Sequence, residues 1–155
     1  MNAFDLSGRN AVVTGGGRGI GLEISRALAL AGAKVLITGR DAATLKKAAS
    51  SLQGEVYAYA ADISKEDDVT RLLAHAETVI GEVDILVNNA GINPYYNRTE
   101  HTTLEEWTHI IDVNLTGVFL CTRIFGQPML ERQQGSIVNI TSVAAHTGLA
   151  RTGAY

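Results

Sequence analysis

The chain has 155 residues, enough to bury the core of one domain, and its 46% hydrophobic and 19% charged residues are typical of a globular protein. A net charge of −3 argues against a nucleic-acid partner, and no apolar run approaches the roughly 20 residues that a membrane-spanning helix needs. The single cysteine, Cys121, excludes an internal disulfide and is typical of a reducing compartment, so we expect a cytoplasmic protein.

Short apolar runs alternate with longer stretches of helical periodicity along the chain. The apolar runs occupy residues 10–14, 34–38, 56–60, 84–88 and 136–140. Several of them are apolar almost without interruption, which is typical of parallel strands that are covered on both faces. We therefore expect a doubly wound, Rossmann-like α/β fold with a parallel sheet, forming a single domain over residues 1–155.

Three helix starts are indicated by residues that favour the N-cap position. Asp41 directly precedes a helical pattern and is suited to cap it. Ser64 with Asp67, and Thr103 with Glu106, have the spacing of a capping box, in which a hydroxyl and a carboxylate each bind a free backbone N–H. The sequence therefore predicts helices that begin just after each of these positions.

A glycine-rich segment, "TGGGRGIG", joins the first predicted strand to the first predicted helix. Gly15, Gly19 and Gly21 lack a Cβ, so the backbone can turn sharply and a pyrophosphate can approach the free N–H groups at the helix start. The spacing is G-x-x-x-G-x-G, which differs from the general G-x-G-x-x-G fingerprint. A flexible turn is the alternative, but the position between strand and helix favours a dinucleotide site.

The end of the second predicted strand bears on which dinucleotide binds. A site specific for NAD would place a carboxylate there to hold the ribose 2′-hydroxyl, but the sequence has Gly39 followed by Arg40. Arg40, with Arg18 in the glycine-rich segment, could hold a 2′-phosphate, so NADP(H) is favoured. Asp41 leaves NAD(H) possible if it points inward, and both arginines could instead be solvated surface residues.

Five motifs occur in the order of one known family: "TGGGRGIG", "ADIS", "NNAG", "DVNLTG" and "SIVNITS…GAY". Over residues 5–155 the chain resembles the short-chain dehydrogenase/reductase family, and it is similar to 3-oxoacyl-carrier-protein reductases and to sugar or sugar-acid dehydrogenases. The resemblance implies that Asp62 and Ile63 contact adenine and that the "NNAG" segment lines the cofactor cleft. With the glycine-rich segment and the two arginines, the cofactor-binding candidates are Gly15, Arg18, Gly19, Ile20, Gly21, Arg40, Asp62, Ile63, Asn89, Ala90 and Gly91.

An amide lies on the apolar face of the long predicted helix that starts after Thr103. Trp107, Ile110, Asn114 and Val118 follow helical spacing, so Asn114 needs hydrogen-bond partners or costs about 1–3 kcal/mol. A structural amide that binds the backbone is one interpretation. The resemblance implies another, in which Asn114 holds a water in a proton relay.

Ser142 follows the fifth predicted strand at the carboxyl edge of the sheet, where parallel sheets bind their ligands. The resemblance implies that Ser142 donates a hydrogen bond to a substrate carbonyl, that Tyr155 transfers the proton, and that hydride passes between nicotinamide and the carbonyl carbon. Since the hydroxyl of a free tyrosine has a pKa of about 10, the family lowers it with a lysine four residues later. That position, 159, lies beyond the sequence.

We therefore expect this chain to be the N-terminal portion of an enzyme of about 250 residues, containing five of seven strands and lacking turnover by itself. The expected substrate is a small carbonyl compound or alcohol, and the expected assembly of the full-length parent is a homotetramer or homodimer. The alternative is a non-catalytic dinucleotide-binding module. No metal is expected, because the four histidines lack the spacing of metal ligands: His75, His101, His109 and His146.

Overall fold

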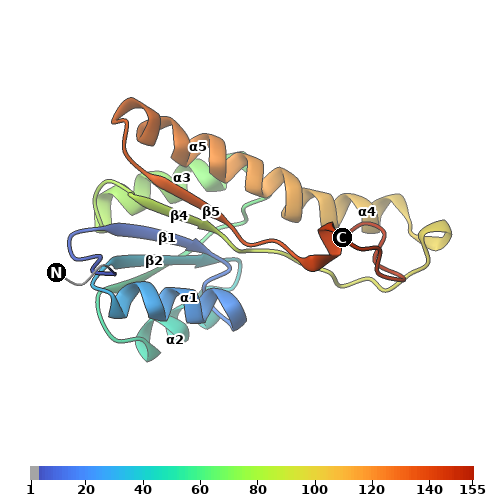
Figure 1. The fold of residues 1–155 in the computed structure, drawn as a ribbon, viewed down its shortest axis with the longest axis horizontal. Coiled ribbons are helices and arrows are strands. Elements are labelled where there is room, and N and C mark those ends of the chain that lie inside the picture. Colours follow the sequence, from blue (N-terminus) through green and yellow to red (C-terminus); the bar gives the residue numbers. More distant parts are fainter. Residues whose placement is uncertain (1–3) are drawn as a thin grey trace.

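The computed structural model describes residues 4–155 and contains a five-stranded parallel sheet in the order β3-β2-β1-β4-β5 (Figure 1). Helices cover both faces of this sheet, so the protein has an α/β, Rossmann-like fold, as the apolar runs predict. The strands are β1 (Asn10–Thr14), β2 (Lys34–Gly39), β3 (Val56–Ala60), β4 (Ile85–Asn88) and β5 (Ser136–Asn139). The α-helices are α1 (Gly19–Leu30), α2 (Ala42–Ser51), α3 (Glu66–Val79), α4 (Leu104–Ile111) and α5 (Gly117–Glu131).

Successive residues of the central strands point into two separate cores. Val12, Leu36 and Leu86 belong to a cluster shared with α3 and α5, whereas Val13 and Ile37 belong to a cluster shared with α1 and α2. All five side chains are fully buried. Each contributes about 1.5–3 kcal/mol relative to an exposed position, which explains why the strands are apolar on both faces.

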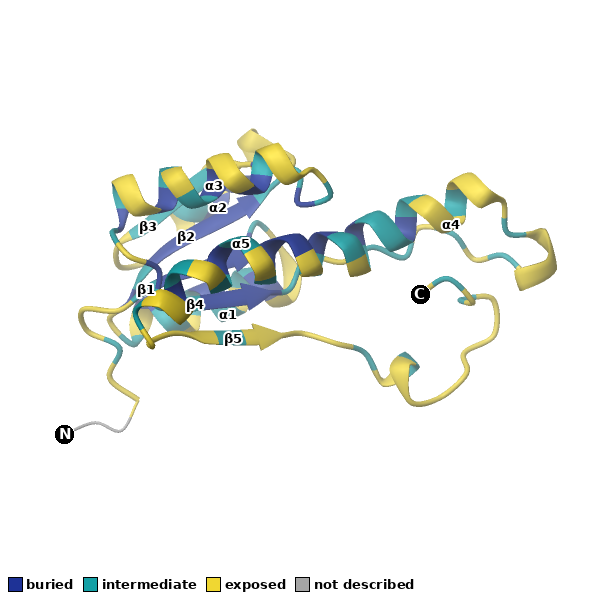
Figure 2. Cartoon of the chain, turned by 90° about the horizontal axis from the view of Figure 1, so that it is seen from above, coloured by how far each residue is buried: buried dark blue, intermediate teal, exposed yellow. Residues whose placement is uncertain are grey.

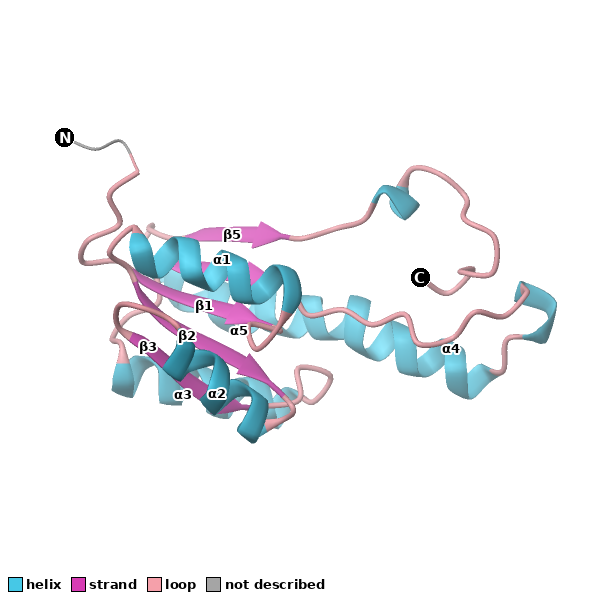
Figure 3. Ribbon diagram, turned by 90° about the horizontal axis from the view of Figure 1, so that it is seen from below, coloured by secondary structure: helices cyan, strands magenta, loops and turns pink. Residues whose placement is uncertain are grey.

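The segment from α4 to α5 forms one long helical rod (Figure 3). It begins with the predicted capping box, in which the Thr103 side chain accepts from the Glu106 N–H and the Glu106 carboxylate accepts from the Thr103 N–H. A π-helical segment, η2 (Asp112–Thr116), separates α4 from α5. This segment changes the helical phase in the middle of the rod, and it contains Asn114.

The predicted capping box of Ser64 and Asp67 is wrong, and the third helix begins one residue later than it indicates. The N-cap of α3 is Lys65, which makes no side-chain cap bond, and the Ser64 hydroxyl instead donates to the Asp62 carboxylate at 2.7 Å. Asp41 does cap α2, since its side chain accepts from the Thr44 N–H at 2.6 Å. The polar groups that follow β3 are thus used to shape the loop before the helix begins.

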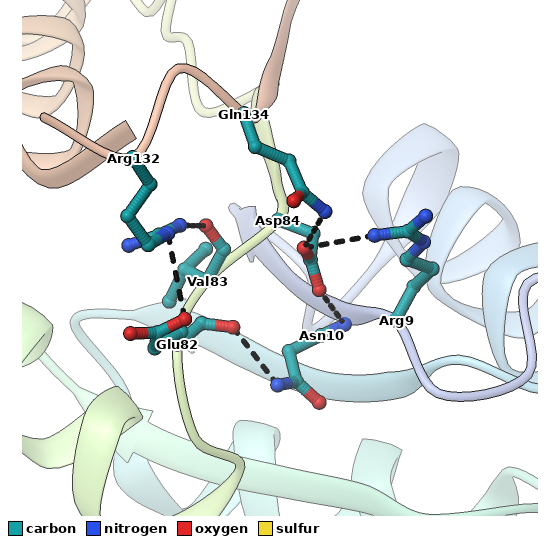
Figure 4. A network of polar contacts seen from close by, with 7 residues as sticks. All are labelled: Arg9, Asn10, Glu82, Val83, Asp84, Arg132 and Gln134. Atoms are coloured by element: carbon teal, nitrogen blue, oxygen red, sulfur yellow. Dashed lines mark hydrogen bonds and ion pairs between the residues drawn. The ribbon is translucent and has the colours of Figure 1, made fainter. Parts of the chain in front are cut away.

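A polar network joins the amino ends of β1, β4 and β5 (Figure 4). The Asp84 carboxylate accepts from the backbone N–H of Asn10 at 3.0 Å, from the Arg9 guanidinium at 3.3 Å and from the Gln134 amide at 3.3 Å. The Arg132 guanidinium donates to the Val83 carbonyl at 3.0 Å. These contacts hold three strands in register at the edge of the sheet opposite the carboxyl ends.

The strand β5 lies at one edge of the sheet and, unlike the central strands, is largely exposed (Figure 2). Val138 retains 44% of its accessible surface. Among residues 4–155, no helix is long and apolar enough to cross a membrane.

Candidate functional site

A cavity of about 600 Å³ opens at the carboxyl ends of the first four strands. Every cofactor-binding candidate from the sequence lines it: Gly15, Arg18, Gly19, Ile20, Gly21, Arg40, Asp62, Ile63, Asn89, Ala90 and Gly91. The rest of the wall includes Gly39 and Asp41, which the sequence analysis considered for cofactor choice, and seven residues without a sequence signal: Gly17, Thr38, Thr44, Leu45, Ala61, Ile92 and Val113. These seven residues come from β2, α2, η2 and the connecting loops, and only the fold brings them to one cavity.

Two glycines in the first turn of α1 are required for different reasons. Gly19 has a φ of +54°, a left-handed conformation that side chains disfavour, and open space surrounds it. Gly21 is packed so tightly that a Cβ would lie 2.3 Å from the Gly15 carbonyl oxygen and 2.4 Å from Nδ2 of Asn89. The close packing of Gly21 brings the start of α1 against the end of β1.

The start of α1 can bind an anion. Its N-cap residue, Arg18, makes no side-chain cap hydrogen bond, and the first turn contains no acidic residue. The free N–H groups and the positive end of the helix dipole therefore face the cavity, where a pyrophosphate would gain hydrogen bonds.

Thr14 joins the ends of β1 and β4, a role that the sequence analysis missed. Its fully buried hydroxyl accepts from the backbone N–H groups of Asn89 and Ala90, both at 3.0 Å, and donates to the Val87 carbonyl at 3.3 Å. The Asn89 amide returns a hydrogen bond to the Thr14 carbonyl at 2.9 Å. A buried hydroxyl at the end of an apolar strand was the available signal, but its partners lie about 75 residues away.

The guanidinium groups of Arg18 and Arg40 are available to a ligand. Both residues are exposed, and neither side chain makes an ion pair or hydrogen bond with residues 4–155, whereas seven other ion pairs form there. Gly39 ends β2 without a side chain, so no carboxylate stands at the last position of that strand. Asp41 also lines the cavity, with its Oδ1 atom bound to the Thr44 N–H.

The loop after β3 is shaped by two carboxylates. The Asp62 carboxylate accepts from the backbone N–H of Ser64 at 3.1 Å, while the Asp62 N–H donates to Asp68 at 2.9 Å. That backbone hydrogen bond lowers the pKa of Asp68 below its usual value. Ile63 is buried against Gly117, where a Cβ would lie only 2.8 Å from the isoleucine side chain. The loop is therefore fixed between α3 and the start of α5.

Asn114 is bonded to the backbone of Ile92, which lines the cavity. Its Oδ1 atom accepts from the Ile92 N–H at 2.8 Å, and its Nδ2 group donates to the Ile92 carbonyl at 2.8 Å. This geometry is that of the structural amide. One amide hydrogen remains free of protein partners within the described chain, and the relay role stays a prediction.

Ser142 and Tyr155 do not line the cavity. Ser142 accepts from the Ala144 N–H at 3.2 Å and caps the short 3-10 helix η3 (Val143–Ala145). Tyr155 is 48% exposed at the end of a segment that runs beyond the sheet (Figure 2). No hydrogen bond between residues 4–155 joins Asn114, Ser142 and Tyr155 to one another, so their catalytic roles stay predictions.

The loop after "NNAG" is held against α4. The Tyr95 hydroxyl lies 2.9 Å from Nδ1 of His109, and the Asn97 amide donates to both oxygens of Glu106 at 2.8 and 2.9 Å. These side chains bind the helix, which leaves Tyr96, 66% exposed, as the accessible aromatic of this loop.

A smaller hollow of about 390 Å³ lies where residues 153–154 meet the start of α4. Its wall is formed by Thr99, Thr102, Thr103, Leu104, Trp107, Gly153 and Ala154. No ionisable side chain lines this hollow, so it is less suited to a charged ligand than the larger cavity.

Comparison with known proteins decides the family. The family described as short chain dehydrogenase matches residues 9–155. The chain belongs to this family. A solved structure described as a short chain dehydrogenase/reductase family protein superposes with a TM-score of 0.91 at 41% identity, covering 97% of this chain and 62% of that chain.

Three curated relatives of this short-chain dehydrogenase chain are informative. Galactitol 2-dehydrogenase (L-tagatose-forming) of Cereibacter sphaeroides is 42% identical over 91% of this chain and 55% of the enzyme. The 3-oxoacyl-[acyl-carrier-protein] reductase of Synechocystis sp. is 40% identical over 92% of this chain and 59% of that protein. The NADP-dependent (R)-specific alcohol dehydrogenase of Lentilactobacillus kefiri is 43% identical over 97% of this chain and 60% of that enzyme. The chain thus spans 55–60% of the length of these relatives.

Proposed function

We propose that this chain binds NADP(H), and that the whole protein transfers hydride between nicotinamide and a carbonyl or secondary-alcohol substrate. The observation that carries the cofactor assignment is the pair of guanidinium groups of Arg18 and Arg40, which have no partner within residues 4–155 and lie beside a strand end that lacks a carboxylate. A guanidinium binds a phosphate through two parallel hydrogen bonds, which suits the 2′-phosphate of NADP(H). One relative, the alcohol dehydrogenase of Lentilactobacillus kefiri, is named as NADP-dependent, which supports the same choice.

In the proposed reaction, the nicotinamide supplies or accepts the hydride when the cofactor is bound. Ser142 donates a hydrogen bond to the substrate oxygen and Tyr155 gives or takes its proton, whereas Asn114 fixes the Ile92 wall and holds a relay water. Ser142 directly follows the β5 strand and its extension, at the carboxyl edge of the sheet where the cavity opens. This arrangement supports a substrate that enters from the same edge as the nicotinamide.

The cofactor assignment is tested by titrating NADPH and NADH against the chain and its Arg40→Ala variant, using isothermal calorimetry. Losing one charge-assisted bidentate contact is expected to make the binding free energy of NADPH less favourable by about 1.5–3 kcal/mol and to leave that of NADH nearly unchanged. Arg26→Ala is a matched control, because Arg26 lies on α1 outside the cavity and pairs with Glu23. Equal losses for both cofactors would contradict the assignment to NADP(H).

The reaction is tested in the whole protein with Tyr155→Phe. We expect NADPH binding to persist and reduction of ketone substrates to be lost, because phenylalanine cannot transfer a proton. Ketose sugars and 3-oxoacyl thioesters form the substrate panel, since the relatives include a galactitol dehydrogenase and an acyl-carrier-protein reductase. A whole protein that binds NADPH but reduces no carbonyl compound would favour the non-catalytic module.

We also propose that the whole protein forms a homodimer or homotetramer through the rod formed by α4 and α5. Large apolar side chains on this rod are exposed, with exposed fractions of 79% at Leu104, 45% at Trp107, 63% at Leu115 and 56% at Phe119. Several large apolar side chains exposed on one helical rod favour an interface there. Light scattering on the whole protein and on Phe119→Glu tests it, and an unchanged oligomer in the variant would contradict it.

A further inference from the structure

The cavity contains as many negative as positive side chains. Its ionisable residues are Arg18, Arg40, Asp41 and Asp62, so two carboxylates oppose two guanidinium groups. A site built only for a cofactor with an additional phosphate would have an excess of positive charge. The carboxylates therefore reduce the attraction that the arginines exert on a phosphate in this cavity.

The two carboxylates differ in position. Asp62 follows β3, and its Oδ1 atom accepts from both the N–H and the hydroxyl of Ser64. Asp41 is the direct neighbour of Arg40 and stands at the N-cap of α2, where its Oδ1 atom accepts from the Thr44 N–H. Of the two, Asp41 is therefore the carboxylate beside the proposed phosphate-binding arginine.

The Asp41 charge is fixed in place and present at neutral pH. Capping α2 holds the carboxylate at the cavity wall, and hydrogen bonding by the Thr44 side chain and backbone lowers its pKa further. Neither Arg18 nor Arg40 forms an ion pair with Asp41 inside the described chain, so this carboxylate does not neutralise them by direct contact. Since both Asp41 and Arg40 line the cavity, the Asp41 charge is available to repel an anion held there.

We propose that Asp41 is the specificity-determining residue that limits the preference for NADP(H), so that the cavity accepts both NADPH and NADH. Its carboxylate repels the 2′-phosphate that Arg40 attracts, and removing this single charge makes the site selective for NADPH. The inference rests on the proposed function, because it presumes a dinucleotide in this cavity.

A different role for Asp41 makes the opposite prediction. A carboxylate near the end of β2 can accept a hydrogen bond from the ribose 2′-hydroxyl, which favours NADH. In that case, removing the charge weakens the binding of NADH. In the role we propose, removing the charge strengthens the binding of NADPH and leaves that of NADH unchanged. The Thr44 N–H occupies only one oxygen of Asp41, so the other can still accept from a ribose and the titration below decides between the two roles.

The test is calorimetric titration of NADPH and NADH against the chain and its Asp41→Asn variant. Asparagine caps a helix about as well as aspartate, so the variant removes the charge and keeps α2. We expect NADPH to bind about three- to tenfold more tightly and NADH to keep its affinity, because only NADPH carries the additional dianionic phosphate. The gain shrinks as salt is added, since added ions screen the repulsion.

Asp5→Asn is the matched control, since it removes the same charge from a hydrogen-bonded carboxylate far from the cavity. The neighbouring Leu6 N–H binds Ala31 at the end of α1, whereas the cavity lies at the start of that helix, about 18 Å away. Unchanged or weaker NADPH binding in Asp41→Asn, an equal gain in Asp5→Asn, or weaker NADH binding would each overturn the role of Asp41. A chain that binds neither cofactor would instead overturn the proposed function itself.

Discussion

Replacing Gly21 with alanine tests the close packing of the start of α1 against β1 most severely. The new Cβ would lie 2.3 Å from the Gly15 carbonyl oxygen and 2.4 Å from Nδ2 of Asn89, whereas ordinary contact begins at 3.4 Å. The start of α1 must therefore move by about 1 Å from β1, which loosens the hydrogen bond from Asn89 to the Thr14 carbonyl.

The cost of Gly21→Ala can be estimated from these contacts. Overpacking against backbone costs about 1–3 kcal/mol, and a weakened buried hydrogen bond costs about 1 kcal/mol more. Alanine recovers about 1 kcal/mol of helix propensity within α1. We expect the free energy of unfolding to fall by about 1–3 kcal/mol, with a loss of dinucleotide affinity.

The assay is urea denaturation followed by far-UV circular dichroism, with Gly8→Ala as a matched control. Unlike Gly21, Gly8 has open space around it, and its φ of +78° lies in the left-handed region, so its substitution reports backbone strain alone. That strain is worth about 1–2 kcal/mol, and Gly8 lies outside the cavity, so its variant should keep full dinucleotide affinity. A Gly21→Ala chain with unchanged stability and unchanged affinity would refute the reasoning from close packing.

Three further substitutions follow from individual contacts. Gly39→Asp should shift the cofactor preference towards NADH, because a Cβ there meets only Leu45 at 3.8 Å and the new carboxylate can accept from a ribose hydroxyl. Paired NADH and NADPH titrations measure this preference, and an unchanged ratio of the two affinities would count against the site. Asp84→Ala should lower the free energy of unfolding by about 2–3 kcal/mol in urea denaturation, since it removes the acceptor of three hydrogen bonds; a loss below about 0.5 kcal/mol would show that the network is dispensable. Asp68→Asn should make the free energy of unfolding fall less steeply as the pH is lowered into the acid range. The pKa of Asp68 in the folded chain lies below its usual value of 3.8, so the ionised carboxylate stabilises the fold above pH 3.8. This contribution is lost as the pH falls through the pKa of the folded state. Urea titrations at a series of acid pH values check this, and an unchanged slope would show that the Asp62 hydrogen bond adds nothing.

Local pattern was sufficient to predict the strands and the glycine loop. The run that ends at Thr14 predicts the observed bounds, because a short apolar run followed by glycines is typical of a strand covered on both faces. The Thr103–Glu106 capping box was likewise correct, since both partners lie within one helical turn. Contacts within a few residues are readable from spacing alone.

Contacts between distant parts of the chain could not be predicted in this way. Thr14 binds Asn89 across the sheet, and Asn114 binds Ile92 from a π-helical segment that no propensity indicates. Ser64 shows that even a short-range contact can be mispredicted, because its hydroxyl binds the Asp62 carboxylate and not an N–H group at the start of the helix. Each of these polar side chains has several possible hydrogen-bond partners of similar energy, and only the folded geometry determines which one it binds.

The most direct test of the cofactor site is a titration of NADPH into the ¹⁵N-labelled chain, followed by amide chemical shifts. We expect saturable shifts that gather in the segments lining the cavity: residues 15–21, 38–41, 61–63 and 89–92. Absence of saturable shifts, or shifts confined to the hollow at residues 99–107 and 153–154, would contradict it.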